Sequence, residues 1–162
     1  MKKDFTQRFG FLVNDVAKLY GEQFDRLARE RIGLSRAQCR VLGTLAMRGT
    51  EQPLSQTELA QRLGLSTMAV AGLCDRMAAA GWIRRQPSAT DRRINEVHPE
   101  PRASEALDKA LAIGDALNAR AMAALTAPER AELLALLGKV RLGLIDLSPG
   151  ADAGAAATGL AS

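Results

Sequence analysis

Apolar residues recur every three or four positions along residues 4–31, and they are Phe5, Phe9, Leu12, Val16, Leu19 and Leu27. This spacing places them on one face of a helix. Gly33 follows as a left-handed helix cap. Ser35 and Gln38 then form a capping box that opens a second helix, which we expect to end near Met47.

Two short helices separated by a tight turn are predicted next. Ser55 and Glu58 form a capping box at the start of the first, while Gly64 ends it and Ser66 caps the second. Steeply crossed helices need a small residue at their contact, a glycine at the turn and apolar residues facing inward. The residues that meet these needs are Ala60, Gly64, Leu59, Leu63, Leu65, Val70 and Leu73. They predict a helix-turn-helix within 56–75; the alternative is a helical corner with a structural role only.

The helical period then gives way to two segments that favour strands, 82–86 and 93–97. The turn-forming segment 87–91 joins them, so we expect a β-hairpin. An alanine-rich helix is predicted from Ala103 to Leu125.

A capping box of Thr126 and Glu129 opens the last predicted helix, whose apolar residues are Leu133, Leu137, Val140 and Leu144. Residues 148–162 are rich in alanine and glycine and are expected to form a disordered tail. The predicted fold class is therefore mainly α with a small β-hairpin.

Composition narrows the class of protein. The chain has 162 residues, 47% of them hydrophobic, which suits one domain with an appendage. Aromatic residues make up only 4%, so the core must consist of leucine, alanine, valine and methionine. No apolar run approaches the roughly 18 residues of a membrane span, and no signal peptide is recognisable. Two cysteines within apolar segments fit a reducing compartment, so we expect a cytoplasmic protein without a membrane partner.

Positive charge is concentrated beside the predicted helix-turn-helix. The whole chain carries a net charge of +4. Around the hairpin, one acid, Asp91, stands among five arginines: Arg76, Arg84, Arg85, Arg92 and Arg93. Arginines on a hairpin can enter a narrow minor groove, where the negative potential is enhanced. The arrangement favours double-stranded DNA as a partner; the alternative is a solvated polar hairpin.

Enzymatic chemistry is not expected. His98 is the only histidine, and the chain has no zinc-ligand spacing and no phosphate-binding glycine loop. We therefore predict no catalytic residues, no metal and no cofactor. Cys39 lies between Arg36 and Arg40 in sequence, which leaves open a thiol-based redox switch. The alternative is a buried, inert cysteine.

Four sequence blocks carry a resemblance: Leu34–Leu42, the helix-turn-helix, Asp75–Met77 before Gly81–Ile83, and Asp91–Arg93. In this order they resemble the MarR family of bacterial transcription regulators, with the SlyA-like branch nearest. The resemblance extends over roughly residues 5–147. It implies a winged helix-turn-helix DNA-binding domain in residues 34–101, and a helical dimerisation region made of 1–33 and 102–147. Such a protein acts as a homodimer on a palindromic operator.

The resemblance and the predicted elements together assign the DNA-binding residues: Ser55, Gln56, Thr57, Ser66, Thr67, Met68, Ala71, Arg76, Arg84, Arg92 and Arg93. The chain departs from the family at Ala71 and Gly72, where relatives often carry a bulkier polar residue and an arginine. Specificity is therefore expected to depend more on the wing and on DNA shape. Pro99 cannot donate a ladder hydrogen bond, so the second wing strand is expected to end by His98.

The resemblance also suggests a wing-orienting residue and a ligand cleft. Asp75 is expected to pair with Arg93; the alternative is an exposed, unpaired acid. The walls expected for the cleft are Val13, Val16, Tyr20, Cys39 and Leu42, each of which also suits a plain core position. The predicted function is a repressor released by a small aromatic or anionic effector. The alternatives are a protein-interaction adaptor and the redox switch.

Overall fold

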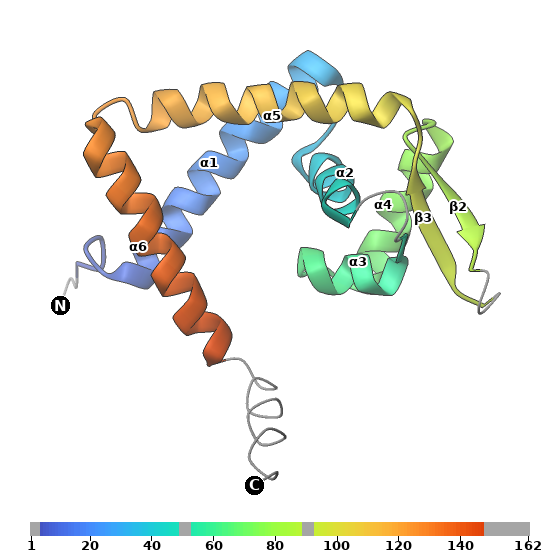
Figure 1. Cartoon of the computed structure of the whole chain (residues 1–162), viewed down its shortest axis with the longest axis horizontal. Helices are drawn as coiled ribbons and strands as arrows, with labels where there is room; N and C mark the ends of the chain where they lie inside the picture. Colours follow the sequence, from blue (N-terminus) through green and yellow to red (C-terminus); the bar gives the residue numbers. More distant parts are fainter. Residues whose placement is uncertain (1–3, 49–52, 89–92, 148–162) are drawn as a thin grey trace, which may run out of the picture. The chain divides into compact units, whose positions relative to one another are not determined.

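The computed structural model describes residues 4–48, 53–88 and 93–147 (Figure 1). Its elements are α1 (Phe9–Ile32), α2 (Arg36–Arg48), β1 (Leu54–Ser55), α3 (Gln56–Leu63), α4 (Thr67–Ala79), β2 (Ile83–Pro87), β3 (Asn95–Pro99), α5 (Arg102–Ala121) and α6 (Ala127–Asp146). The chain divides into two compact units, Met1–Leu117 and Asn118–Ser162. The predicted class, mainly helical with a small antiparallel sheet, is confirmed. The predicted tail, 148–162, lies outside the described residues.

Helix α1 begins later than the apolar pattern predicts. The side chain of Asp4 accepts hydrogen bonds from the Thr6 backbone N–H at 2.9 Å and from its hydroxyl at 2.7 Å. This local turn competes with helix formation, so the helix starts at Phe9 and not at residue 4. Gly33 ends it in the predicted left-handed conformation, with φ of 68°.

Three antiparallel strands form the sheet, in the order β1-β3-β2. Strand β1 was not predicted, because two residues are too short for a periodic signal. Strand β3 continues to Pro99, one residue further than expected. The N–H of Glu100 donates to the Trp82 carbonyl at 3.0 Å, so the neighbouring Pro99 nitrogen points away from β2. Strand β1 pairs only with Glu96 and Val97, so the missing N–H of Pro99 has no ladder partner to lose.

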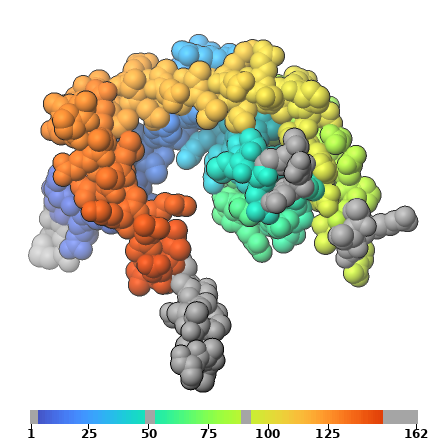
Figure 2. All heavy atoms as spheres, in the orientation of Figure 1, coloured from blue at the N-terminus to red at the C-terminus, as the bar shows by residue number. Residues whose placement is uncertain are grey.

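The helix-turn-helix has the predicted interior with one exception. Ala60, Leu63, Val70 and Leu73 are buried, as is Leu59, in a core shared with α2, the sheet and the first part of α5. In the space-filling view these elements, from teal through yellow, pack together (Figure 2). Leu65, by contrast, is 38% exposed and is not the buried apolar residue that was expected. Its backbone N–H donates to the Ala60 carbonyl at 3.0 Å, so the backbone of this residue closes the turn.

Helix α5 begins at Arg102, as expected within one residue, but ends at Ala121, four residues before the predicted Leu125. Helix α6 starts with the predicted capping box of Thr126 and Glu129. None of its residues is buried, and its exposed large apolar residues are Leu133, Leu134, Leu136, Leu137, Val140, Leu142, Leu144 and Ile145. Helix α1 separately exposes Phe9, Phe11, Leu12, Val13, Val16 and Leu19. Within the described ranges, no helix is long and apolar enough for a membrane crossing.

Candidate nucleic-acid interface

The first turn of α4 is exposed and free of bulky neighbours. Ser66 caps the helix, and its hydroxyl accepts a hydrogen bond from the Ala69 N–H at 3.1 Å. Thr67 is exposed beside it, and Met68 is 83% exposed. Val70, on the opposite side, is fully buried. The core therefore holds α4 by one face while its N-terminal residues face solvent, which is the arrangement that a recognition helix requires.

The side chain of Arg76 lies close to Gly72. A Cβ atom built on Gly72 would lie 3.6 Å from the Nη1 atom of Arg76. The guanidinium thus reaches back along α4 over position 72. Arg76 is exposed, so this cation remains available at the helix surface.

The start of α3 faces the wing across a hollow of about 460 Å³. Ser55, Gln56, Thr57 and Arg93 all line it, so the structure brings together four of the predicted DNA-binding residues. The Nε2 atom of Gln56 is buried and makes no hydrogen bond within the described part of the chain. The free donor and the α3 N-terminus suit an anion such as phosphate.

Ser55 lines the same hollow, but its polar groups are used in the helix cap. The N–H and hydroxyl of Ser55 each donate to the Glu58 carboxylate at 2.8 Å, and the Ser55 oxygen accepts from the Glu58 N–H at 3.2 Å. These bonds, first that from the Ser55 N–H, lower the pKa of Glu58. Ser55 therefore sets where α3 starts, and its neighbours Gln56 and Thr57 are better placed to bind DNA.

Asp75 pairs with Arg85 of β2, and not with Arg93 as expected. The alternation of side chains along a strand explains this result. Ile83 is buried, and Arg85, two residues later, points to the same face, whereas Arg84 points to the other. Asp75 thus has a different partner from the one expected, and the ion pair joins α4 to the first wing strand. The alternation of side chains from buried Ile83 could have predicted that Arg85 faces α4.

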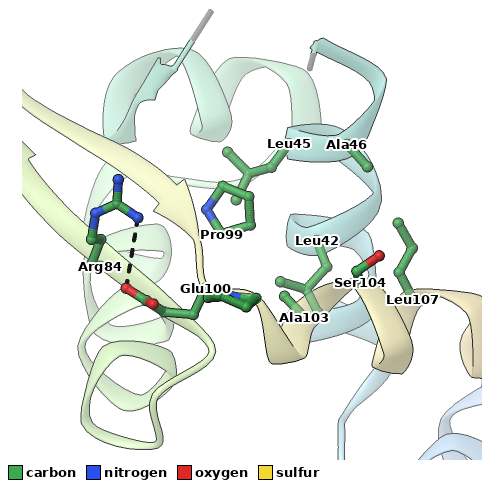
Figure 3. Close-up of a pocket in the computed structure, with 10 residues that line it drawn as sticks. Leu42, Leu45, Ala46, Arg84, Pro99, Glu100, Ala103, Ser104 and Leu107 are labelled. Atoms are coloured by element: carbon green, nitrogen blue, oxygen red, sulfur yellow. Dashed lines mark ion pairs between the residues drawn. The ribbon is translucent and has the colours of Figure 1, made fainter. Parts of the chain in front are cut away.

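Arg84 faces a cavity and an acidic partner. Its Nη1 atom lies 3.8 Å from Oε1 of Glu100, a residue that sequence reasoning did not single out (Figure 3). Of the other wing arginines, Arg93 is exposed next to β3. Arg92 lies outside the described residues.

The five residues expected to line a ligand cleft do not all line the same cavity. Leu42 lines a cavity of about 380 Å³, together with residues of the wing and the start of α5: Arg84, Pro99, Glu100, Ala103, Ser104 and Leu107 (Figure 3). Val13 and Val16 are exposed on α1, and Cys39 is buried in the core. Tyr20 stacks on Phe24 at 6.5 Å between ring centroids. These four residues do not line the cavity. Their spacing in the sequence indicates a shared helix face, but it does not reveal which other element that face contacts.

Both cysteines are buried and free. Burial raises the pKa of Cys39 to about 11, and nearby Asp25 adds to the effect. Burial likewise raises the pKa of Cys74. A redox sensor needs a thiolate at neutral pH, so these surroundings disfavour the redox alternative.

Comparison with known proteins finds one family model and several solved structures that are similar to this chain. The MarR family model matches residues 32–94. A sequence search of curated proteins finds no match. Among solved structures, a cysteine-to-serine mutant of MarR from E. coli in complex with operator DNA is 23% identical, with a TM-score of 0.72 over 86% of this chain and 99% of that one.

Two further solved structures share the fold. The transcriptional regulator BldR from Sulfolobus solfataricus is 25% identical, with a TM-score of 0.67 over 86% of this chain and 97% of that one. BpsR from Bordetella bronchiseptica, whose DNA binding is regulated by 6-hydroxynicotinic acid, is 19% identical, with a TM-score of 0.71 over 87% and 98%. The MarR family model thus matches the winged-helix segment of this chain, and these solved structures share its fold.

Proposed function

We propose that the protein is a SlyA-like, homodimeric repressor that binds a palindromic operator. Residues 34–101 form its DNA-binding domain, with α4 in the major groove and the wing at the minor groove. The observation that carries this proposal is the exposed first turn of α4, where Ser66, Thr67 and Met68 face solvent while the opposite face is buried. The operator complex of E. coli MarR, a structure of the same fold, supports it.

Contacts to DNA divide into those that read bases and those that hold the backbone. Thr67 and Ala71 on α4 are assigned to base edges, where Met68 contacts thymine methyl groups. The buried donor of Gln56 and the α3 N-terminus hold phosphate. Arg76 supplies the cation that position 72 lacks, since its guanidinium reaches that part of the helix.

Dimerisation is assigned to residues 1–33 and 102–147. Exposed apolar patches of this extent are costly in water and mark interaction surfaces. Helix α1 and helix α6 each expose a set of large apolar side chains in the single chain. A second copy of the chain would cover them and would present two α4 helices to two operator half-sites.

The effector is assigned to the cavity beside Arg84. Its volume of about 380 Å³ is in the range of small-molecule sites. Leu42, Pro99 and Leu107 supply apolar walls for an aromatic ring, and Arg84 supplies a cation for a carboxylate. The aromatic acid that regulates BpsR, a protein of the same fold, is of this chemical class. Because the cavity joins β2 to the start of α5, a ligand there acts on the position of the wing.

The test is DNase I footprinting of purified protein on the DNA upstream of its own gene and on sites selected from random duplexes. The proposal predicts protection of two half-sites about one helical turn apart. Thr67→Glu, which puts a negative charge on the exposed turn of α4, should abolish protection without loss of fold. Absence of protection by the wild type at low salt would instead favour the protein-interaction adaptor.

A further inference from the structure

A second basic surface lies between α1 and α2, outside the residues assigned to DNA above. It is a cleft of about 760 Å³. Two acidic residues line it, Glu22 and Asp25, together with five cationic ones, which are Lys18, Arg26, Arg29, Arg36 and Arg40. The excess of positive charge in this region favours an anionic partner, although Arg26 is already paired with Glu30 at 3.4 Å.

One of the two acidic groups, Asp25, is already engaged. The carboxylate of Asp25 accepts a hydrogen bond from Nε of Arg29 and another from the backbone N–H of Arg36, each at 2.7 Å. It therefore stays ionised and neutralises Arg29 and the N-terminus of α2. Within the described part of the chain, the side chains of Lys18 and Arg36 form no ion pair.

Two of the guanidinium groups lie against backbone, and one of them is hydrogen-bonded to it. Gly21 is buried, and a Cβ atom at this position would collide with the guanidinium of Arg36. The glycine thus lets Arg36 lie directly against α1. Arg40, one turn further along α2, donates from Nη2 to the Leu63 carbonyl at 2.9 Å. Cations fixed in this way lose less side-chain entropy when they bind an anion than cations on free side chains.

The cleft is continuous with the helix-turn-helix. Leu65 lines it, and the next residue, Ser66, is the N-cap of α4. Leu65 was expected to face the core of the helix-turn-helix. Its side chain instead lines the cleft, where it is partly exposed. Arg40 contacts the last residue of α3, Leu63. The cationic surface therefore begins directly beside the first turn of the helix assigned to the major groove.

We propose that this cleft binds the phosphodiester backbone of the same duplex that α4 contacts. The inference rests on the proposed function and extends it. A duplex carries a phosphate about every 3.4 Å along each strand, so the strand that passes the α4 N-terminus continues past the neighbouring surface. Arg36 and Arg40 act as phosphate ligands, whereas Leu65 packs against sugar.

The test compares Arg36→Gln with Arg31→Gln. Both remove one charge from this region, but Arg31 does not line the cleft. Affinity for one operator duplex is measured by fluorescence anisotropy at several salt concentrations. Because each phosphate contact adds about 0.9 to the slope of log K against log salt, Arg36→Gln should flatten the slope of the dimer by about 2. It should weaken binding about tenfold near 0.15 M salt. Arg31→Gln should match the wild type.

Phosphate ethylation interference locates the contact. At least one phosphate in each half-site should impair wild-type binding when ethylated and have no effect on Arg36→Gln. Circular dichroism melting checks that the variant is folded; should it be unfolded, Lys18→Gln takes its place with the same expectations.

An unchanged slope and unchanged interference pattern in a folded variant would overturn the inference and leave the proposed function intact. If inorganic phosphate raises the Tm of the wild type but not of Arg36→Gln, while DNA binding is equal, the cleft is a site for a free anion and the inference is wrong. A wild type that binds no DNA refutes both proposals.

Discussion

The guanidinium of Arg102 stacks on the ring of Trp82, with its central carbon 3.8 Å from the ring centroid. Its Nη1 atom also donates to the Ala80 carbonyl at 3.0 Å, just after the end of α4. One side chain at the start of α5 thus holds both the C-terminus of α4 and the residue that enters β2. This side chain therefore connects α5 to both α4 and β2.

Replacing Arg102 should therefore loosen this junction. We expect Arg102→Gln to lower the free energy of unfolding by about 1 kcal/mol, the scale of a partly exposed cation–π contact. Arg102→Lys keeps the charge but loses the planar stacking group, so its stability should fall between those of the wild type and Arg102→Gln. Urea denaturation followed by circular dichroism measures both. Wild-type stability in Arg102→Gln would show that the stack contributes nothing.

The α3 cap makes stability dependent on pH. The hydrogen bonds from Ser55 lower the pKa of Glu58 below its ordinary value of 4.5. A carboxyl group with a lowered pKa in the folded state stabilises the fold above its unfolded pKa and loses that effect as the pH falls through the folded value. We therefore expect wild type to exceed Glu58→Gln in stability at pH 7, and the difference to shrink below about pH 4.5. Urea titrations at pH 7 and pH 3 measure it; a difference that grows on acidification would contradict this assignment.

Cys39 should be unreactive in the native protein. With a pKa of about 11, only about one thiol in 10⁴ is ionised at pH 7. The ordinary value of 9.0 gives about one in 100, so ionisation alone predicts labelling by iodoacetamide about a hundredfold slower in the native state than in urea. Mass spectrometry of the labelled peptide follows the reaction, with Cys39→Ser to isolate Cys74. Rapid labelling of the native protein, together with oxidant-induced release from DNA, would instead support the redox-switch hypothesis.

Glu100 should compete with an anionic effector for Arg84, since the two lie 3.8 Å apart at the cavity. We expect Glu100→Gln to bind benzoate more tightly than wild type, because the cation is then left without its acid. Arg84→Gln should bind it more weakly. Thermal shift against benzoate concentration tests this, with the amide benzamide as the uncharged control. If Glu100→Gln binds benzoate no better than wild type, the carboxylate of the ligand does not meet Arg84.

The sequence predicted the elements whose signals are local. Three helix starts were marked by pairs that form both halves of a capping box: Ser35 with Gln38, Ser55 with Glu58, and Thr126 with Glu129. Gly64 adopts the expected left-handed turn, with φ of 65°. Each of these depends on residues no more than three positions apart.

The site was predicted less well because its contacts are long-range. Leu42 meets Arg84 and Glu100 only through packing of three separate elements, and no spacing in the sequence encodes that meeting. The pairing of Asp75 with Arg85 was within reach, since alternation from Ile83 fixes the face of β2. Pro99 remains within β3 because its nitrogen faces the side of the strand where β1 does not pair with it. This depends on how the strands are arranged in the sheet, which the residue type does not reveal.

We propose that the α4 N-terminus, the α3 N-terminus and the wing form one surface that neutralises DNA phosphates. The salt dependence of wild-type binding to its footprinted operator tests this. With about three or four phosphates per subunit, log K should fall with log salt at a slope near −6 for the dimer. A slope near zero, or equal affinity for a duplex and for an uncharged backbone analogue of it, would contradict the account.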